Sequence, residues 1–245
     1  MRAPLLALAL VAVPVTAHAE IPGVRYDGHN SSQDFALELR LNYGKPDIDA
    51  APGLTGKPYE QTFGSDSRFG YGAELDWQFL RIPHVGSLGA GVGVGRWATS
   101  AKAVNYVDLS PTGDDTNLVL WQFAGLGVFR FDALADIGIP FVPFAKAGLG
   151  YTLWRAYGPD GTYGSRSASG NRSLGASYGF QYSVGLALHL DRLDPSSAKN
   201  LDEATGVNNT YLFVEYTDAR LQSASSGSAL WVGGTSTTGG LALEF

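Results

Sequence analysis

The sequence predicts an all-β fold, a closed antiparallel barrel of eight strands that spans a membrane. The first observation is the stretch 174–190, in which apolar or aromatic residues alternate with Gly, Ser, Ala, Gln and His. A period of two is typical of a strand, and this one is far longer than the common globular strand of about 5–6 residues. Its second face is small and uncharged, which suits the inside of a narrow barrel.

Composition is the second observation, and it excludes several classes of protein. Only 16% of the residues are charged, whereas soluble domains average about 25%. The chain has 32 Gly, no Cys and a formal net charge of −6. Without Cys there are no disulfides or thiolate metal sites, and without a basic run we expect no nucleic-acid partner.

The start of the chain is typical of an exported protein. Residues 1–19 contain Arg2, a short apolar run and an Ala-His-Ala cleavage site, which together predict a secretory signal peptide. Residues 20–33 are rich in Pro, Gly, Asn and Ser, and we predict an N-terminal periplasmic tail or plug there. The single barrel domain is predicted over 34–245.

Alternation of apolar with small or polar residues recurs along the chain, and an even number of strands is typical of a closed bacterial barrel. The predicted strands are 34–43, 68–79, 88–97, 116–131, 145–153, 174–190, 210–218 and 230–245. The glycines between 89 and 95 alternate with apolar residues and lack the following helix of a nucleotide-binding loop, so we interpret them as lumen-facing.

The segment 116–131 is bulky on both faces, and its orientation stays open at this point. One alternative directs Leu118, Leu120, Ala124, Leu126 and Val128 to lipid. The other directs Trp121, Phe123, Phe129 and Phe131 to lipid. A bulge could also switch the faces midway.

Connections alternate in length, as they do in outer-membrane barrels. Long loops are predicted at 44–67, 99–115 and 155–172, short turns at 81–86 and 132–140, and a Ser-rich loop at 219–229. The 191–209 connector is intermediate in length and carries a predicted helical turn around 197–204. Aromatic residues gather near both ends of the strands, as expected at two membrane interfaces.

This pattern resembles the eight-stranded outer-membrane barrels of Gram-negative bacteria, of the OmpA-transmembrane-domain and OmpX type. The most specific feature is the C-terminal GLALEF, in which Leu241, Leu243 and Phe245 look like the terminal signal that the barrel assembly machinery recognises. The resemblance implies a monomer in the cell outer membrane. It also implies contact with outer-membrane lipids and lipopolysaccharide, and handling by periplasmic chaperones.

Charged residues on the inward faces form the main candidate site. They are Glu38, Arg40, Arg68, Glu74, Asp76, Lys146 and Glu215. Charges inside a narrow lumen must be paired, so we predict a network of salt bridges. The functional alternative is a polar path for small ions, but eight strands leave a lumen only wide enough for side chains.

No catalytic arrangement stands out. The four His residues are not predicted at the outer-leaflet end of a strand, where a lipid-modifying enzyme would need an acid or base. The loop aspartates match no calcium-loop spacing, so we expect no cofactor and no metal. The sequence thus favours a non-enzymatic integral outer-membrane protein with an envelope-structural or surface-interaction role. The alternatives are a narrow channel or carrier for small or apolar solutes, a lipid-modifying enzyme, and a soluble lipocalin-like barrel.

Overall fold

The computed structural model describes residues 34–104, 110–158, 173–223 and 230–245. The predicted signal peptide and the predicted tail lie outside the described residues, and both stay predictions. Among the described residues, no helix is long and apolar enough to cross a membrane.

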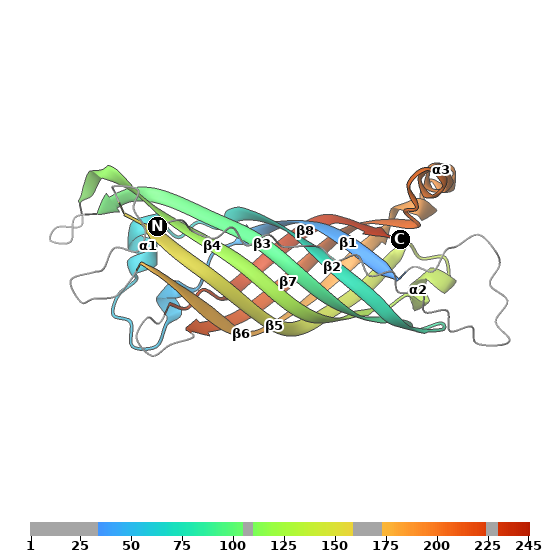
Figure 1. Ribbon diagram of the computed structural model, residues 1–245, viewed down its shortest axis with the longest axis horizontal. Coiled ribbons are helices and arrows are strands. Elements are labelled where there is room, and N and C mark those ends of the chain that lie inside the picture. Colours follow the sequence, from blue (N-terminus) through green and yellow to red (C-terminus); the bar gives the residue numbers. More distant parts are fainter. Residues whose placement is uncertain (1–33, 105–109, 159–172, 224–229) are drawn as a thin grey trace, which may run out of the picture. The chain divides into compact units, whose positions relative to one another are not determined.

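Eight antiparallel strands form one closed barrel, in which each strand pairs with the next along the sequence and β8 pairs with β1 (Figure 1). They are β1 (Phe35–Gly44), β2 (Arg68–Ile82), β3 (Gly86–Val104), β4 (Pro111–Arg130), β5 (Phe141–Tyr157), β6 (Leu174–His189), β7 (Asn209–Ser223) and β8 (Gly234–Glu244). The predicted fold class, an eight-stranded antiparallel meander, is confirmed.

The pairing register tilts the strands around a narrow interior. The stagger of the strands can be measured by following register partners once around the barrel from Gly44 on β1, which leads to Gln78 on β2. The N–H of Gln78 donates to the carbonyl of Asp34. The path therefore returns to the first strand ten residues before its starting point. A stagger of this kind is what closes a tilted sheet, and with eight strands it leaves a lumen that side chains fill.

The apolar side of each alternating strand faces outward. Val92 on β3, Phe180 on β6 and Leu212 on β7 are 65%, 73% and 54% exposed on the outside of the barrel. The inward glycines between these apolar residues give the lumen its space, as predicted: Gly89 and Gly91 on β3 are buried. The alternation of residue types with a period of two thus reflects two different environments, the lumen and the outside of the barrel.

The orientation of β4 is the second of the two alternatives, without a switch. Trp121 and Phe123 are 40% and 41% exposed on the outside, whereas Leu120 and Leu126 are buried in the lumen. The register from β4 to β5 is continuous over its whole length, so no bulge intervenes.

The predicted loop at 99–115 is wrong in extent. Strand β3 continues to Val104 and β4 begins at Pro111, so most of the polar segment is a projecting hairpin (Figure 1). Lys102 pairs with Asp115 across it at 2.8 Å between charged atoms. Likewise β7 continues into the predicted Ser-rich loop as far as Ser223. Polar composition there marks exposure to water and does not end the strand.

Short helices occupy the connections. Helices η1 (Ile48–Ala50) and α1 (Pro58–Phe63) follow β1, α2 (Ala133–Asp136) joins β4 to β5, and η2 (Leu190–Arg192) and α3 (Pro195–Thr205) join β6 to β7. The helical turn predicted in the 191–209 connector is therefore confirmed. We call the end that carries η1 and α1 the long-loop end, and the end that carries α2 and α3 the short-turn end.

Helix α3 starts and stops on local signals. Asp194 accepts hydrogen bonds from the N–H and hydroxyl of Ser197 and from the hydroxyl of Ser196, and these lower the pKa of its carboxyl to about 2. Pro195 occupies the first helical position, and Gly206 ends the helix in the left-handed conformation with φ of 75°.

Candidate functional site

The lumen is built in layers that can be followed along one strand. On β5, Val142 and Phe144 face inward at the short-turn end, Lys146 follows, then Thr152, and Trp154 lies at the long-loop end. An apolar layer therefore comes first, a charged layer second, a neutral polar layer third and another apolar layer last.

Two clusters of buried apolar residues form the outer layers. The short-turn cluster consists of Val142, Phe144, Ala187, Tyr211, Phe213 and Ala242. The long-loop cluster consists of Ile48, Tyr59, Trp97, Leu118, Leu120, Trp154, Leu221 and Val232. Because Ile48 and Tyr59 come from η1 and α1, the connection after β1 folds back over the lumen and contributes to the long-loop cluster.

Hydrogen bonds hold that connection in place. The carboxylate of Asp49 accepts from the backbone N–H groups of Tyr59 and Glu60 at 2.8 and 2.9 Å. Burial raises the pKa of the Tyr59 hydroxyl to about 12. Hydrogen bonds from Lys57 and Lys45 lower the pKa of the Glu60 carboxyl, which lies on the exposed side of α1.

The charged layer is a network of eight side chains, each at most 12% exposed. We call it the lumen network. Its cations are Arg40, Arg130 and Lys146, and its carboxylates are Glu38, Glu74, Asp76, Glu215 and Glu244.

Lys146 reaches across the lumen from β5 to carboxylates on three other strands. Its Nζ lies 2.5 Å from Glu74 Oε1, 2.7 Å from Glu38 Oε2 and 3.4 Å from Glu215 Oε2. Glu38 and Glu74 are direct register partners on β1 and β2, an arrangement that is unfavourable for like charges. The ammonium group between them removes that repulsion.

Arg40 supplies the second cation on the same carboxylates. Its Nη1 lies 2.5 Å from Glu38 Oε2 and 2.9 Å from Glu74 Oε2, and its Nη2 donates to Glu215. The guanidinium carbon also lies 5.6 Å from the centre of the Phe213 ring, within the range of a cation–π contact. Contacts of this kind connect the charged layer to the short-turn cluster.

Arg130 and Glu244 complete the network, and sequence reasoning missed both. Arg130 Nη1 lies 2.7 Å from Glu244 Oε1, and Nη2 lies 3.3 Å from Glu38 Oε1. Glu244 also accepts from the Gln78 amide and the Tyr211 hydroxyl. Arg130 was left unassigned because the orientation of 116–131 was open, and Glu244 lies in the segment interpreted as an assembly signal.

Six of the seven predicted residues come together in the network, and Arg68 does not. Arg68 begins β2 at the long-loop end, where its Nη2 donates to the carbonyl of Phe63 at 3.3 Å. Alternation shows that a residue faces inward, but it does not show how far along the barrel axis the residue lies. The prediction from alternation alone therefore placed Arg68 in the network.

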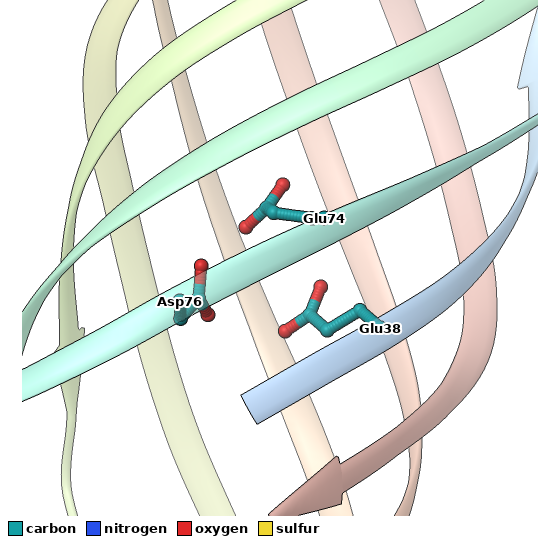
Figure 2. Close-up of side chains that lie close together, drawn as sticks. All are labelled: Glu38, Glu74 and Asp76. Carbon is teal, nitrogen blue, oxygen red and sulfur yellow. The ribbon is translucent and has the colours of Figure 1, made fainter. Parts of the chain in front are cut away.

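The acidic members outnumber the basic ones, and one of them is incompletely satisfied. Five carboxylates face three cations within the network. Asp76 is 0% exposed and neither of its carboxylate oxygens has a hydrogen-bond partner. Figure 2 shows its carboxyl group beside those of Glu74 and Glu38, and one oxygen from each of the three lies within 4.8 Å of the others. These three residues could hold a cation.

Glycines on β3 make room for these carboxylates. A Cβ atom added to Gly91 would lie 2.3 Å from Asp76 Oδ1, and one added to Gly93 would lie 3.5 Å from Glu74 Oε2. Between the network and the long-loop cluster lies a cavity of about 130 Å³, with Arg40, Glu74 and Thr152 in its wall. A polar cavity of this size has room for several water molecules.

The three residues of the predicted assembly signal lie on the outside of the barrel or at its edge. Leu241 and Leu243 face outward on β8, and Phe245 is 42% exposed. The backbones of Phe245 and Phe35 exchange two hydrogen bonds, and their rings are stacked with centres 6.4 Å apart. Recognition of this segment by the assembly machinery stays a prediction.

Comparison with known proteins places the fold. No protein-family model matches the chain, and no curated protein matches it. The outer membrane protein OprG from Pseudomonas aeruginosa is 12% identical with a TM-score of 0.50, over 88% of this chain and 97% of that one. Neisserial surface protein A is 14% identical with a TM-score of 0.44, over 86% and 97%. The outer membrane enzyme PagL is 14% identical with a TM-score of 0.36, over 85% and 98%. The chain therefore has the fold of the eight-stranded outer-membrane barrels.

Proposed function

We propose that the chain is a non-enzymatic integral protein of the outer membrane with an envelope-structural or surface-interaction role. The observation that carries this proposal is an apolar outer face around a lumen that ion pairs cross from wall to wall. Export would use residues 1–19 as a signal peptide, and assembly would use Leu241, Leu243 and Phe245. We expect the chain to act as a monomer, and the closed barrel leaves no free strand edge for pairing with a second chain.

Support for membrane insertion comes from what the barrel exposes. Phe180, Val92 and Leu149 are more than half exposed on the outer wall, at 73%, 65% and 59%. A water-soluble barrel would turn such residues inward, as in the lipocalin-like alternative. Leu186, on the strand that first indicated the fold, is 40% exposed on the outside and not buried in the lumen. Lipid is the solvent that suits this surface.

The long-loop end suits contact with lipopolysaccharide. Outward-facing Arg96 on β3 has Tyr71 and Trp121 as its register partners on either side. Aromatic residues favour the membrane interface, and a guanidinium there lies at the level of lipid phosphates, which it binds well. Periplasmic chaperones and the assembly machinery would meet the chain before it reaches this position.

Transport is the less favoured function because, in the described part of the barrel, ion pairs of the lumen network reach from one wall to another. Lys146 joins β5 to carboxylates of β1, β2 and β7, and Arg130 joins β4 to β1 and β8. Trp97, Leu120 and Val232 of the long-loop cluster line the cavity above them. A solute would have to break buried ion pairs and displace an apolar layer to pass.

An enzymatic role is less favoured because no histidine among the described residues lies at the long-loop end. The two histidines in the described part of the chain, His84 between β2 and β3 and His189 at the end of β6, both lie at the short-turn end. His189 Nε2 lies 2.9 Å from Asn209 Oδ1, and its ring stacks on Tyr211 with centres 4.7 Å apart. General acid–base work on an outer-leaflet lipid needs such a residue at the opposite end.

Two measurements test the proposal. The full chain is expressed with its signal sequence, and membrane fractions are examined for detergent-dependent solubility and heat-modifiable gel migration. The purified protein is then recorded in planar bilayers. We expect recovery in the outer membrane and no discrete conductance steps. Recovery as a detergent-free soluble protein would overturn the membrane assignment, and reproducible unitary conductance would overturn the closed lumen.

A further inference from the structure

We propose that the carboxylates of Glu38, Glu74 and Asp76 bind one divalent metal cation inside the barrel (Figure 2). The three residues project from neighbouring strands β1 and β2 into the charged layer, and one oxygen from each lies within 4.8 Å of the others. This site differs from the loop aspartates considered from the sequence.

Charge balance is the first argument. Five buried carboxylates face three cations in the lumen network, so two negative charges lack a counterpart among the described residues. Uncompensated charge is strongly unfavourable away from water. A single divalent cation would bring the formal sum to zero, and it would share Glu38 and Glu74 with Lys146 and Arg40.

Asp76 supplies the second and independent argument. Its side chain is 0% exposed, and neither oxygen has a hydrogen-bond partner. The nearest cationic atom, Arg130 Nη2, is 3.6 Å from Oδ2, which is too long for a hydrogen bond. A buried carboxylate without hydrogen-bond donors has lost its hydrogen bonds to water, and no protein group replaces them. It is aimed toward Glu74 and Glu38, where a cation would restore what water supplied.

The position of Asp76 depends on Gly91 on the next strand. Asp76 Oδ1 packs against the Gly91 backbone, where a Cβ would lie only 2.3 Å from that oxygen. The adjacent cavity of about 130 Å³, which has Glu74 in its wall, can supply water molecules as further ligands. The cavity thus reaches the site at Glu74, one of the three proposed ligands.

The chemistry of the ligands favours Ca²⁺ among the divalent cations. Carboxylates and water are hard oxygen ligands, and Ca²⁺ accepts irregular sets of six to eight of them at about 2.3–2.6 Å. Two oxygens on opposite sides of such an ion are separated by about twice that bond length. The three carboxylate oxygens, all within 4.8 Å of one another, can therefore reach one ion. Mg²⁺ requires a nearly ideal octahedron at shorter distances and is expected to bind more weakly.

The test uses the full mature chain refolded into detergent without lipopolysaccharide, because lipid phosphates bind divalent cations themselves. The protein is stripped with EDTA, dialysed against Ca²⁺, and its metal content and thermal unfolding midpoint are measured. We expect one Ca²⁺ per chain and a higher midpoint with Ca²⁺ than with EDTA. Mg²⁺ at the same concentration should raise the midpoint less, and K⁺ not at all.

Matched variants separate this site from any other. Asp76→Asn is nearly isosteric and should lose both the bound Ca²⁺ and the Ca²⁺-dependent midpoint shift. Asp115→Asn makes the same charge change on the exposed hairpin and should keep both. Glu74→Gln provides a second ligand variant if Asp76→Asn fails the heat-modifiability test of folding. The proposal is overturned if folded wild-type protein retains no Ca²⁺, which would assign the surplus charge to bound protons, or if folded ligand variants bind Ca²⁺ as the wild type does.

Discussion

Replacing Lys146 with methionine tests how much the lumen network contributes to stability. Methionine keeps an unbranched side chain of similar reach and removes the charge. The ammonium group contacts Glu74 at 2.5 Å, Glu38 at 2.7 Å and Glu215 at 3.4 Å. Its loss leaves five buried carboxylates against two cations, and the register partners Glu38 and Glu74 then repel each other more strongly.

The expected magnitude follows from the burial of the pair. Lys146 is 0% and Glu74 3% exposed in their side chains, so solvent does not screen the interaction. Removing one partner of a buried ion pair lowers stability by about 3–5 kcal/mol. Glu74→Gln acts in the opposite direction on the charge balance, because it removes one of the surplus carboxylates. It should lower stability by only about 1 kcal/mol, the contribution of an ordinary hydrogen bond.

The assay is equilibrium unfolding in urea with the refolded barrel in lipid vesicles, followed by tryptophan fluorescence and by heat-modifiable gel migration. Adding Glu74→Gln to the Lys146→Met background should recover about 1–3 kcal/mol, since the two residues interact directly. Lys102→Met is the matched control, because its partner Asp115 is 67% exposed and such surface pairs contribute at most about 1 kcal/mol. Equal effects of the two lysine variants, or a Glu74→Gln effect as large as that of Lys146→Met, would refute the reasoning.

Three further perturbations follow from the geometry. Gly91→Ala should lower the free energy of unfolding in urea by about 1–3 kcal/mol, because the new Cβ would lie 2.3 Å from Asp76 Oδ1. Asp49→Ala removes the acceptor of the Tyr59 N–H, so limited proteolysis should cut the connection after β1 faster while the barrel stays intact. The pKa of Asp194 is lowered to about 2, so its ionised carboxylate stabilises the start of α3 fully above the usual carboxyl pKa. This stabilisation is lost as the pH falls toward 2. Hydrogen exchange in α3, corrected for the intrinsic rate, should stay slow at pH 4 and accelerate only near pH 2.

Each of these predictions has a control variant in the same element, the same connection or the adjacent strand. Gly125→Ala adds a methyl group where no atom lies within 4 Å, and it should leave the urea midpoint unchanged or slightly raised. Asp66→Ala should leave proteolysis of the connection after β1 unchanged. In α3, Asp202→Asn should not alter exchange at pH 7, whereas Asp194→Ala should accelerate it at that pH. A control that behaves like its test variant would contradict the corresponding contact.

The strands could be predicted from the sequence because each wall residue meets one of two different solvents. On β6 the outward Tyr178, Phe180 and Val184 are 57%, 73% and 58% exposed, while inward Ser177 and Ser183 are buried. The residue types themselves show this contrast, because the outward residues are aromatic or aliphatic and the inward ones are small and polar. Where it holds, the sequence is sufficient to assign both the strand and the side of the sheet that faces the lumen.

The contrast fails on β4, and there the orientation could not be assigned. Inward Leu118 and Leu120 are apolar because they pack in the long-loop cluster against residues of η1 and α1. The connection after β1 supplies that cluster from more than fifty residues away, so nothing local to 116–131 indicates it. Because β4 was left open, inward Arg130 was missed, and with it the side of the network that contacts Glu244.

Depth in the lumen is likewise invisible to alternation alone. Glu38, Glu74 and Arg68 all face inward, but only the first two are at the level of Lys146. Their level is set by the register between strands, which places Glu38 opposite Glu74 and leaves Arg68 opposite Gly44. The pairing partners therefore depend on the closed ladder as a whole, and the surplus of carboxylates emerges only when the ladder is known.

Buried ion pairs are not an efficient way to stabilise a core, so the lumen network needs a different explanation. In a barrel surrounded by lipid, an apolar lumen would make the two faces of a strand equivalent, and a slip of one residue would exchange them with little penalty. A slip of β1 by one residue would turn Glu38 and Arg40 into lipid and bring Leu37 and Leu39 into the lumen. Each charge placed at mid-membrane costs about 2–4 kcal/mol for a basic residue and somewhat less for an acidic one. The charged layer thus fixes the register of the strands that carry it, because inside and outside differ in charge as well as in size.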